Sequence, residues 1–191
     1  MTMNKRLPIG LLGFFLGLSL LFTLTVFGEK QDGYLELIGV PANQIAGEYD
    51  TKTGIFTADL RHIEGAYVKI TYDKMIITGR VLEWRTKDDY LLVQVDAVLD
   101  KEKMHLTGDQ IEYFSEEERM VAIGNIKVVT DDAVILATRM NYFEEVDKAE
   151  LFDDVVVTVD DGIFRGQHFV MYIDQEIMHF YGPFQGEIQR K

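Results

Sequence analysis

The chain has 191 residues, of which 47% are hydrophobic and 27% are charged, a globular mixture that rules out wholesale disorder. Its 32 acidic and 19 basic side chains give a formal net charge of −13. This charge argues against nucleic acid as a partner, because phosphate binding needs clustered lysine and arginine. Cysteine is absent, so a disulfide, a thiolate metal site and a cysteine nucleophile are all excluded.

An uncharged apolar run extends from Leu7 to Phe27. As a helix it would reach about 31 Å, enough to cross a hydrocarbon core of about 30 Å. Lys5 and Arg6 precede the run, and a basic flank normally stays in the cytoplasm. We therefore predict a cytoplasmic tip over residues 1–6, a transmembrane helix over 7–27 and an external domain over 28–191.

A cleaved signal peptide is the alternative interpretation of this segment, with Val26-Phe27-Gly28 as a weak cleavage site. The apolar part of a signal peptide usually has roughly 7–15 residues, so the longer run favours a retained anchor. Within the run, Gly10, Gly13 and Gly17 fall on nearly one helix face. Such a face allows another helix to approach closely, although glycine is also simply common in membrane helices.

From about Tyr67 onward, β-branched and aromatic runs alternate with short acidic turns, which is typical of successive strands. The pattern repeats every 29 residues without gaps. Two series of positions show the period: Gly79, Gly108, Ala137 and Gly166, and then Val95, Gly124, Asp153 and Gly182. We regard this repeat as the strongest signal in the chain after the apolar run.

A repeat of this length holds two strands of roughly ten residues and two short turns. It predicts an all-β fold in which long hairpins stack sideways as an antiparallel meander. Glycine in the middle of a strand usually marks a bend or bulge, so a bend repeated in each strand would fold the sheet into a V.

The two ends of the predicted domain differ from its middle. Near the N-terminus, Tyr34–Val40 and Ile55–Ile63 are expected to be strands, and Pro41–Gly54 is expected to be a loop. The last strand is expected over Ile177–Ile188, and no later hairpin covers its edge. Pro183 and Gly186 could protect this edge, or the edge could accept a strand of another domain.

Alternation within the strands predicts one continuous apolar face through every repeat. This face is either the closed core of an ordinary sheet protein or a groove that admits acyl chains. The candidate lipid-binding residues on it are Leu82, Trp84, Val93, Ile111, Tyr113, Ile126, Val128, Met140, Tyr142, Val155, Val157, Phe169, Met171, Phe180 and Phe184.

One stretch of the repeat carries a resemblance to a known family. Leu106–Tyr113 is a strand that ends in tyrosine, and Ile123–Val128 is a Gly-Asn-aliphatic strand that follows after a turn. Together with the basic tip, the single apolar run and the paired strands, this resembles the lipopolysaccharide-transport family that includes LptA and LptC, and in particular its anchored, LptC-like members. The likeness is closest in residues 105–130 and looser elsewhere.

The resemblance implies a V-shaped β-jellyroll whose apolar trough holds the acyl chains of lipopolysaccharide. An anchored member would sit in the inner membrane with its domain in the periplasm. It would receive lipopolysaccharide from an ATP-binding-cassette transporter of the LptB, LptF and LptG type, with its helix packed against the transporter. It would then pass the lipid to a soluble LptA-like jellyroll through its C-terminal edge strand.

Other functions fit the residues less well. The four histidines lack zinc-type spacing, the chain has no nucleophile signature, and the carboxylates cluster in turns, so we expect no enzyme, no catalytic residue, no metal and no cofactor. The remaining alternatives are a soluble bridge protein with a cleaved signal peptide and an anchored β scaffold that binds only protein partners.

Overall fold

The computed structural model describes residues 33–72 and 74–188. Within them the chain forms one sheet of 13 strands, in which every pairing is antiparallel, and the only helical segments are the single 3-10 turns η1 (Ser115–Glu117) and η2 (Glu144–Val146). This confirms the predicted antiparallel all-β class. The predicted transmembrane helix, with Gly10, Gly13 and Gly17, lies outside the described residues.

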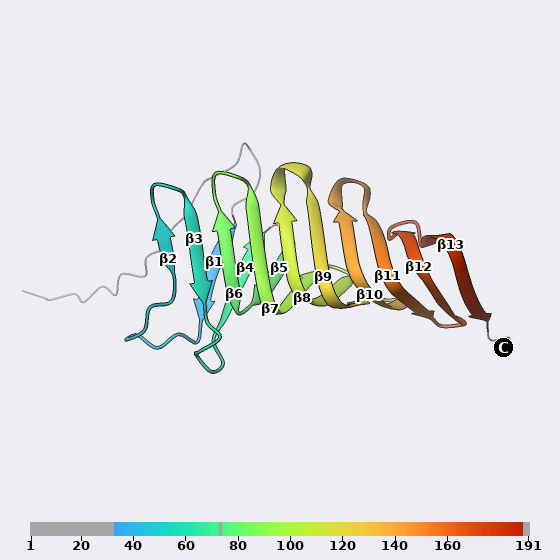
Figure 1. Ribbon diagram of the computed structural model, residues 1–191, viewed down its shortest axis with the longest axis horizontal. Helices are drawn as coiled ribbons and strands as arrows, with labels where there is room; N and C mark the ends of the chain where they lie inside the picture. Colours follow the sequence, from blue (N-terminus) through green and yellow to red (C-terminus); the bar gives the residue numbers. More distant parts are fainter. Residues whose placement is uncertain (1–32, 73, 189–191) are drawn as a thin grey trace, which may run out of the picture.

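The strands follow one another along the molecule (Figure 1). In chain order they are β1 (Tyr34–Ile38), β2 (Glu48–Asp50), β3 (Ile55–Asp59), β4 (Tyr67–Tyr72), β5 (Met75–Gly79), β6 (Val81–Arg85), β7 (Tyr90–Lys101), β8 (Met104–Phe114), β9 (Arg119–Val129), β10 (Ala133–Phe143), β11 (Lys148–Val159), β12 (Gly162–Tyr172) and β13 (Ile177–Ile188).

The sheet folds about the middle of its long strands into two wings. The first half of β7 pairs with β6 and its second half pairs with β5. Strands β1, β4 and β5 therefore continue one wing, called here the β1 wing, and β2, β3 and β6 continue the other, the β2 wing. From β7 to β13 the strands form a simple meander, and each long strand contributes one half to each wing.

The bends occur at the repeated positions that the sequence singled out. Backbone φ is positive at Val95 in β7, Gly124 in β9, Asp153 in β11 and Gly182 in β13. The pairing register shifts at each of these points. These shifts are β-bulges, which bend and twist a strand. The predicted mid-strand bend with a 29-residue period is therefore confirmed.

Each bend keeps the apolar face on the inside. In β7 the two residues Val95 and Asp96 both adopt left-handed backbone, and Val93 before them and Ala97 after them are both buried. β11 makes the same bend with Asp153 and Asp154, a residue type that tolerates this conformation better than most. The bulge thus turns the strand without moving its apolar residues to the outer face.

Near the N-terminus, the repeat is interrupted at the bend. β5 and β6 are the two halves of one bent strand, broken at Arg80. β3 and β4 pair with these halves, and residues 60–66 form an insertion between them at the bend. β1 and β2 lie outside β4 and β3 in the same way, with residues 39–47 between them.

These insertions explain where the sequence-based boundaries were wrong. The strand predicted to reach Ile63 ends at Asp59, because the chain turns there and Arg80 Nη2 donates hydrogen bonds to the carbonyls of Leu60 (3.1 Å) and Ile63 (2.8 Å). The segment expected to be a loop as far as Gly54 contains the short strand β2. By contrast, the last strand has the predicted bounds.

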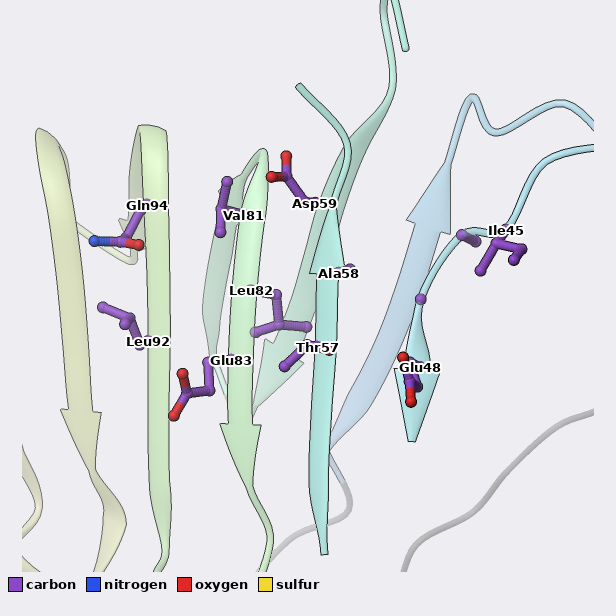
Figure 2. Close-up of a pocket in the computed structure, with 12 residues that line it drawn as sticks. Ile45, Glu48, Thr57, Ala58, Asp59, Val81, Leu82, Glu83, Leu92 and Gln94 are labelled. Carbon is purple, nitrogen blue, oxygen red and sulfur yellow. The ribbon is translucent and has the colours of Figure 1, made fainter. Parts of the chain in front are cut away.

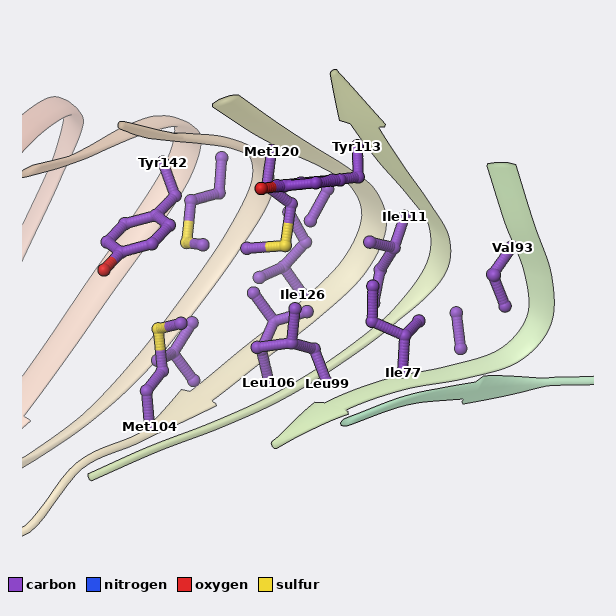
Figure 3. Close-up of a cluster of buried hydrophobic side chains, with 14 of the residues drawn as sticks. Ile77, Val93, Leu99, Met104, Leu106, Ile111, Tyr113, Met120, Ile126 and Tyr142 are labelled. Carbon is purple, nitrogen blue, oxygen red and sulfur yellow. The ribbon is translucent and has the colours of Figure 1, made fainter. Parts of the chain in front are cut away.

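The core lies between the wings as a single cluster (Figure 3). Leu99 and Leu106 of the β1 wing face Ile111 and Met120 of the β2 wing, and the strands curve around them (Figure 3). Leu99 and Leu106 have no exposed surface. The space between the wings is therefore the apolar interior of the protein.

Candidate lipid-binding site

The residues predicted to bind lipid come together on the inner faces of the wings. Apart from Phe184, all of them belong to the core cluster or pack against it. The β2 wing supplies Leu82, Trp84, Val93, Ile111, Tyr113, Met140, Tyr142, Phe169, Met171 and Phe180. The β1 wing supplies Ile126, Val128, Val155, Val157 and Phe184. The predicted shared face is confirmed, and the role of these side chains toward lipid stays a prediction.

The middle of the interior is filled by the protein's own side chains. Val93, Leu151, Val157 and Phe169 are fully buried, and Met140 is nearly so. Such density is that of an ordinary protein core. In this stretch an acyl chain can enter only if side chains change rotamer, so the middle of the trough is closed in this structure.

The interior opens at the β13 end. Phe180 contacts Phe169 edge-on with ring centroids 4.7 Å apart, and it stacks on Phe184 at 4.5 Å. Phe164 adds a third ring at 5.2 Å from Phe180. Phe184 is 50% exposed and Ile188 is 72% exposed, because no strand among residues 33–72 and 74–188 pairs with the outer edge of β13. A continuous group of aromatic and aliphatic side chains therefore leads from the core to solvent at this end.

Two hollows adjoin the ends of the trough. One, of about 470 Å³, lies at the bends of β11–β13 and is lined by Val155, Pro183 and Phe184 among others. The other, of about 320 Å³, lies between residues 45–48 and strands β3 and β6 (Figure 2). Both hollows carry charged side chains, Glu48 and Glu83 in the second and Asp154 and Arg165 in the first, so the chemistry of each suits an acyl chain poorly.

A contact between charged side chains crosses the long opening between the free edges of the wings, called here the rims. Lys101 Nζ of β7 forms an ion pair with Glu144 Oε1 of η2 at 2.7 Å. The hydroxyl of Tyr113 donates a hydrogen bond to Glu144 Oε2 at 3.1 Å, and the hydroxyl of Tyr142 donates one to Asp147. The ion pair closes the side of the trough near its middle, and the two tyrosine hydrogen bonds fix the carboxylates of the β2-wing rim.

Burial and neighbouring carboxylates keep the two rim tyrosines protonated. Loss of solvent raises the pKa of Tyr113 well above its usual value, and the Glu144 carboxylate beside it raises the pKa further. The pKa of Tyr142 is raised in the same way, by burial and then by its hydrogen bond to Asp147. Both hydroxyls are thus fixed donors at neutral pH.

Residues 33–72 and 74–188 also bear on other kinds of site. No group of three or more histidine, aspartate or glutamate side chains in that part of the chain is arranged to hold a metal ion. None of its helical segments is long and apolar enough to span a membrane.

The fold has a counterpart among solved structures. The chain resembles the crystal structure of LptH from Pseudomonas aeruginosa, described as the LptA-homologous periplasmic component of the lipopolysaccharide transport device. The TM-score is 0.56 and the sequence identity is 15%, over 61% of this chain and 95% of LptH. The two proteins share a fold. No family model and no curated protein matches the chain.

Two parts of the site were not predicted from the sequence. Phe164 belongs to the exposed aromatic group at the β13 end. In the sequence, the neighbouring positions on the same strand face are Gly162 and Gly166, so this part of the strand did not show an apolar face. Alternation after Ala97 and Leu99 places Lys101 at an inward position of β7, so the sequence did contain a signal that this lysine faces the interior. That it pairs with Glu144, a residue 43 positions away, follows only from the folding of the sheet.

Proposed function

We propose that this protein is a periplasmic component of lipopolysaccharide transport that carries acyl chains along its apolar interior. The observation that carries the proposal is the aromatic group at the β13 end, where Phe164, Phe180 and Phe184 connect a closed core to solvent. The fold shared with LptH supports the choice of lipid. Binding would come from burial of acyl chains, worth about 0.8 kcal/mol for each methylene.

Photo-crosslinking in cells tests this proposal with a matched pair of positions. Phe180 points inward against Phe169, and its neighbour Tyr181 points outward and stacks on His168. A benzophenone amino acid at position 180 should yield lipopolysaccharide adducts, and the same group at 181 should yield few. Equal adduct yields at the two positions, or none at either, would refute lipid carriage in the trough.

The proposed location is the inner membrane, with residues 7–27 as a retained anchor and the β domain in the periplasm. Gly13 and Gly17 would pack this helix against a membrane subunit of the ATP-binding-cassette transporter that supplies the lipid. Replacing both with leucine should weaken co-purification with the transporter and leave membrane insertion intact. Unchanged co-purification would limit the helix to anchoring, and an N-terminus beginning near residue 28 would instead favour the cleaved, soluble form.

The proposed partner at the other end is a soluble LptA-like jellyroll that adds its first strand to β13. An uncovered strand of 12 residues offers unpaired backbone groups along its whole length. Deleting residues 177–191 should therefore abolish binding to the bridge protein and leave binding to the transporter. Full affinity of the truncated protein for the bridge partner would place the junction elsewhere.

A second candidate function is an anchored scaffold that binds proteins and no lipid. The filled middle of the trough, with Leu151 and Phe169 fully buried, favours it. The crosslinking pair separates the two, because a scaffold yields protein adducts at position 180 and no lipid adducts. In either role we propose that the protein has no catalytic activity, since the chain carries no nucleophile signature.

A further inference from the structure

Lys101 occupies an inward position where an apolar residue is expected. The inner face of β7 continues through Ala97 and Leu99, both buried, to Lys101 at the rim. In the neighbouring strands its direct partners are Met75 and Met104, which are buried. A cation therefore stands in the middle of an apolar row, a position that is costly unless the charge is paired.

The partner of this lysine comes from the opposite wing. β7 and β10 are separated in the sheet by β8 and β9, so at about 4.8 Å per strand the two lie about 14 Å apart along it. The 2.7 Å contact between Lys101 and Glu144 thus crosses the opening rather than running along the sheet. Figure 3 shows the same relation, with Met104, next to Lys101, opposite Tyr142.

Further contacts hold the rims together at this point. Lys101 Nζ lies 3.3 Å from the hydroxyl of Tyr142 and 5.1 Å from the centre of its ring. The rings of Tyr72 and Tyr113, from opposite wings, are 5.9 Å apart. The side chains of Lys101 and Glu144 keep 20% and 24% of their surface exposed, so solvent reaches the ion pair. A solute could therefore meet the lysine from outside.

The interior directly beneath the ion pair is built of adaptable side chains. Met75 and Met104 are paired with Lys101 in the two neighbouring strands. Met120 and Met140 face them from the β2 wing. There Met120 is paired with Tyr142, and Met140 precedes Tyr142 by two residues on the same strand face. All four are buried. Methionine has a flexible and polarizable side chain that repacks readily, as at binding surfaces that accept varied ligands. This stretch of the closed interior is thus the one best able to admit a chain from the side.

We propose that Lys101 is the headgroup site of a side opening: it binds the anionic headgroup of an amphiphile whose acyl chain enters between the rims among the four methionines. The headgroup, a phosphate or a carboxylate, replaces Glu144 as the partner of the lysine. The proposal deepens the proposed function, because it names the place and the chemistry by which a lipid enters the trough. A neutral amphiphile cannot enter in this way, since it would leave Lys101 unpaired.

The test uses the full-length protein in phosphatidylcholine nanodiscs with a benzophenone amino acid at position 140. Probes with the same chain length are dodecyl phosphate, dodecanoate and dodecyl maltoside, and adducts are identified by mass. Dodecyl phosphate should give at least about fivefold more adduct than dodecyl maltoside, as expected for one charge-assisted hydrogen bond. Comparable yields from dodecanoate show that any anion serves, and a response to dodecyl phosphate alone assigns a phosphate headgroup.

Three variants decide the role of the lysine. Lys101→Met, which extends the methionine row, should lower the dodecyl phosphate yield to that of dodecyl maltoside, whereas Lys103→Met, at an exposed position in the same turn, should leave it unchanged. Glu144→Gln should raise the yield at least about threefold, because it frees Lys101 for the probe. This last variant keeps the proposal falsifiable even if Lys101→Met fails to fold.

Two results would overturn the proposal: a yield independent of headgroup charge, or a yield unchanged in Glu144→Gln. The outcome is separate from that of the proposed function, which is read by lipopolysaccharide adducts at position 180. If lipopolysaccharide adducts form at position 180 but the probe yield at position 140 does not depend on Lys101, only the proposed side opening is refuted. If the probe yield at position 140 depends on Lys101 but no lipopolysaccharide adducts form at position 180, only the identity of the proposed lipid is refuted.

Discussion

The bends that shape the trough can be tested with two glycines that share a backbone conformation and differ in their surroundings. Gly124 has φ of +76° and Gly182 has φ of +78°. A Cβ at position 182 would have no atom within 4 Å, whereas a Cβ at 124 would lie 2.2 Å from the Oδ2 atom of Asp109. Replacement of each by alanine therefore separates the cost of the backbone from the cost of the contact.

For Gly182→Ala we expect a loss of about 1 kcal/mol or less in the free energy of unfolding. A left-handed backbone costs alanine about 1–2 kcal/mol, and the stiffer unfolded chain returns about 0.4–1 kcal/mol. Gly124→Ala must also displace Asp109, which accepts hydrogen bonds from Asn125 Nδ2 at 2.9 and 3.2 Å. Losing these exposed bonds adds about 0.5–1.5 kcal/mol, for a total of about 0.5–2.5 kcal/mol.

The assay is a urea titration of the full-length protein followed by the fluorescence of Trp84, the single tryptophan of the chain. In both variants the slope of the free energy of unfolding against urea concentration should equal that of the parent protein, and only the midpoint of the transition should change. An equal loss in the two variants, or a larger loss for Gly182→Ala, would refute the inference that crowding against Asp109 adds to the cost of a side chain at position 124.

Two further predictions concern the interior and its tyrosines. Phe169→Ala should cost about 3–5 kcal/mol in the same titration because the ring is fully buried, whereas Phe184→Ala, at a half-exposed position, should cost less than about 1 kcal/mol; similar losses would show that the β13 end is not open. Burial, and then the nearby Glu112 carboxylate, raise the pKa of Tyr90 in the folded protein to about 12. In the unfolded chain the Tyr90 hydroxyl ionises near its usual pKa of 10. The free energy of unfolding should therefore fall as the pH rises from 10 to 12. Tyr113 and Tyr142 act in the same direction, and Tyr90→Phe should reduce the fall without removing it; an unchanged fall in that variant would contradict the assignment.

The repeat made much of the fold predictable. A two-residue side-chain period and a 29-residue spacing are local properties of the chain, so they indicated the long strands, their turns and the shared face without tertiary information. The same reasoning failed where the repeat is interrupted. Nothing local distinguishes residues 60–66 from a strand continuation, because the turn there depends on Arg80, a residue that lies beyond the next two strands.

The candidate site divides in the same way between local pattern and tertiary contact. The sequence by itself determined which side chains face inward, from Leu82 to Phe180, because alternation places them on one side of each strand. Only the tertiary structure decided that Phe169 is sealed in while Phe184 meets solvent, since exposure depends on whether another strand follows β13. It also decided that Lys101 meets Glu144, because the folding of the sheet brings together rims that are distant along the chain.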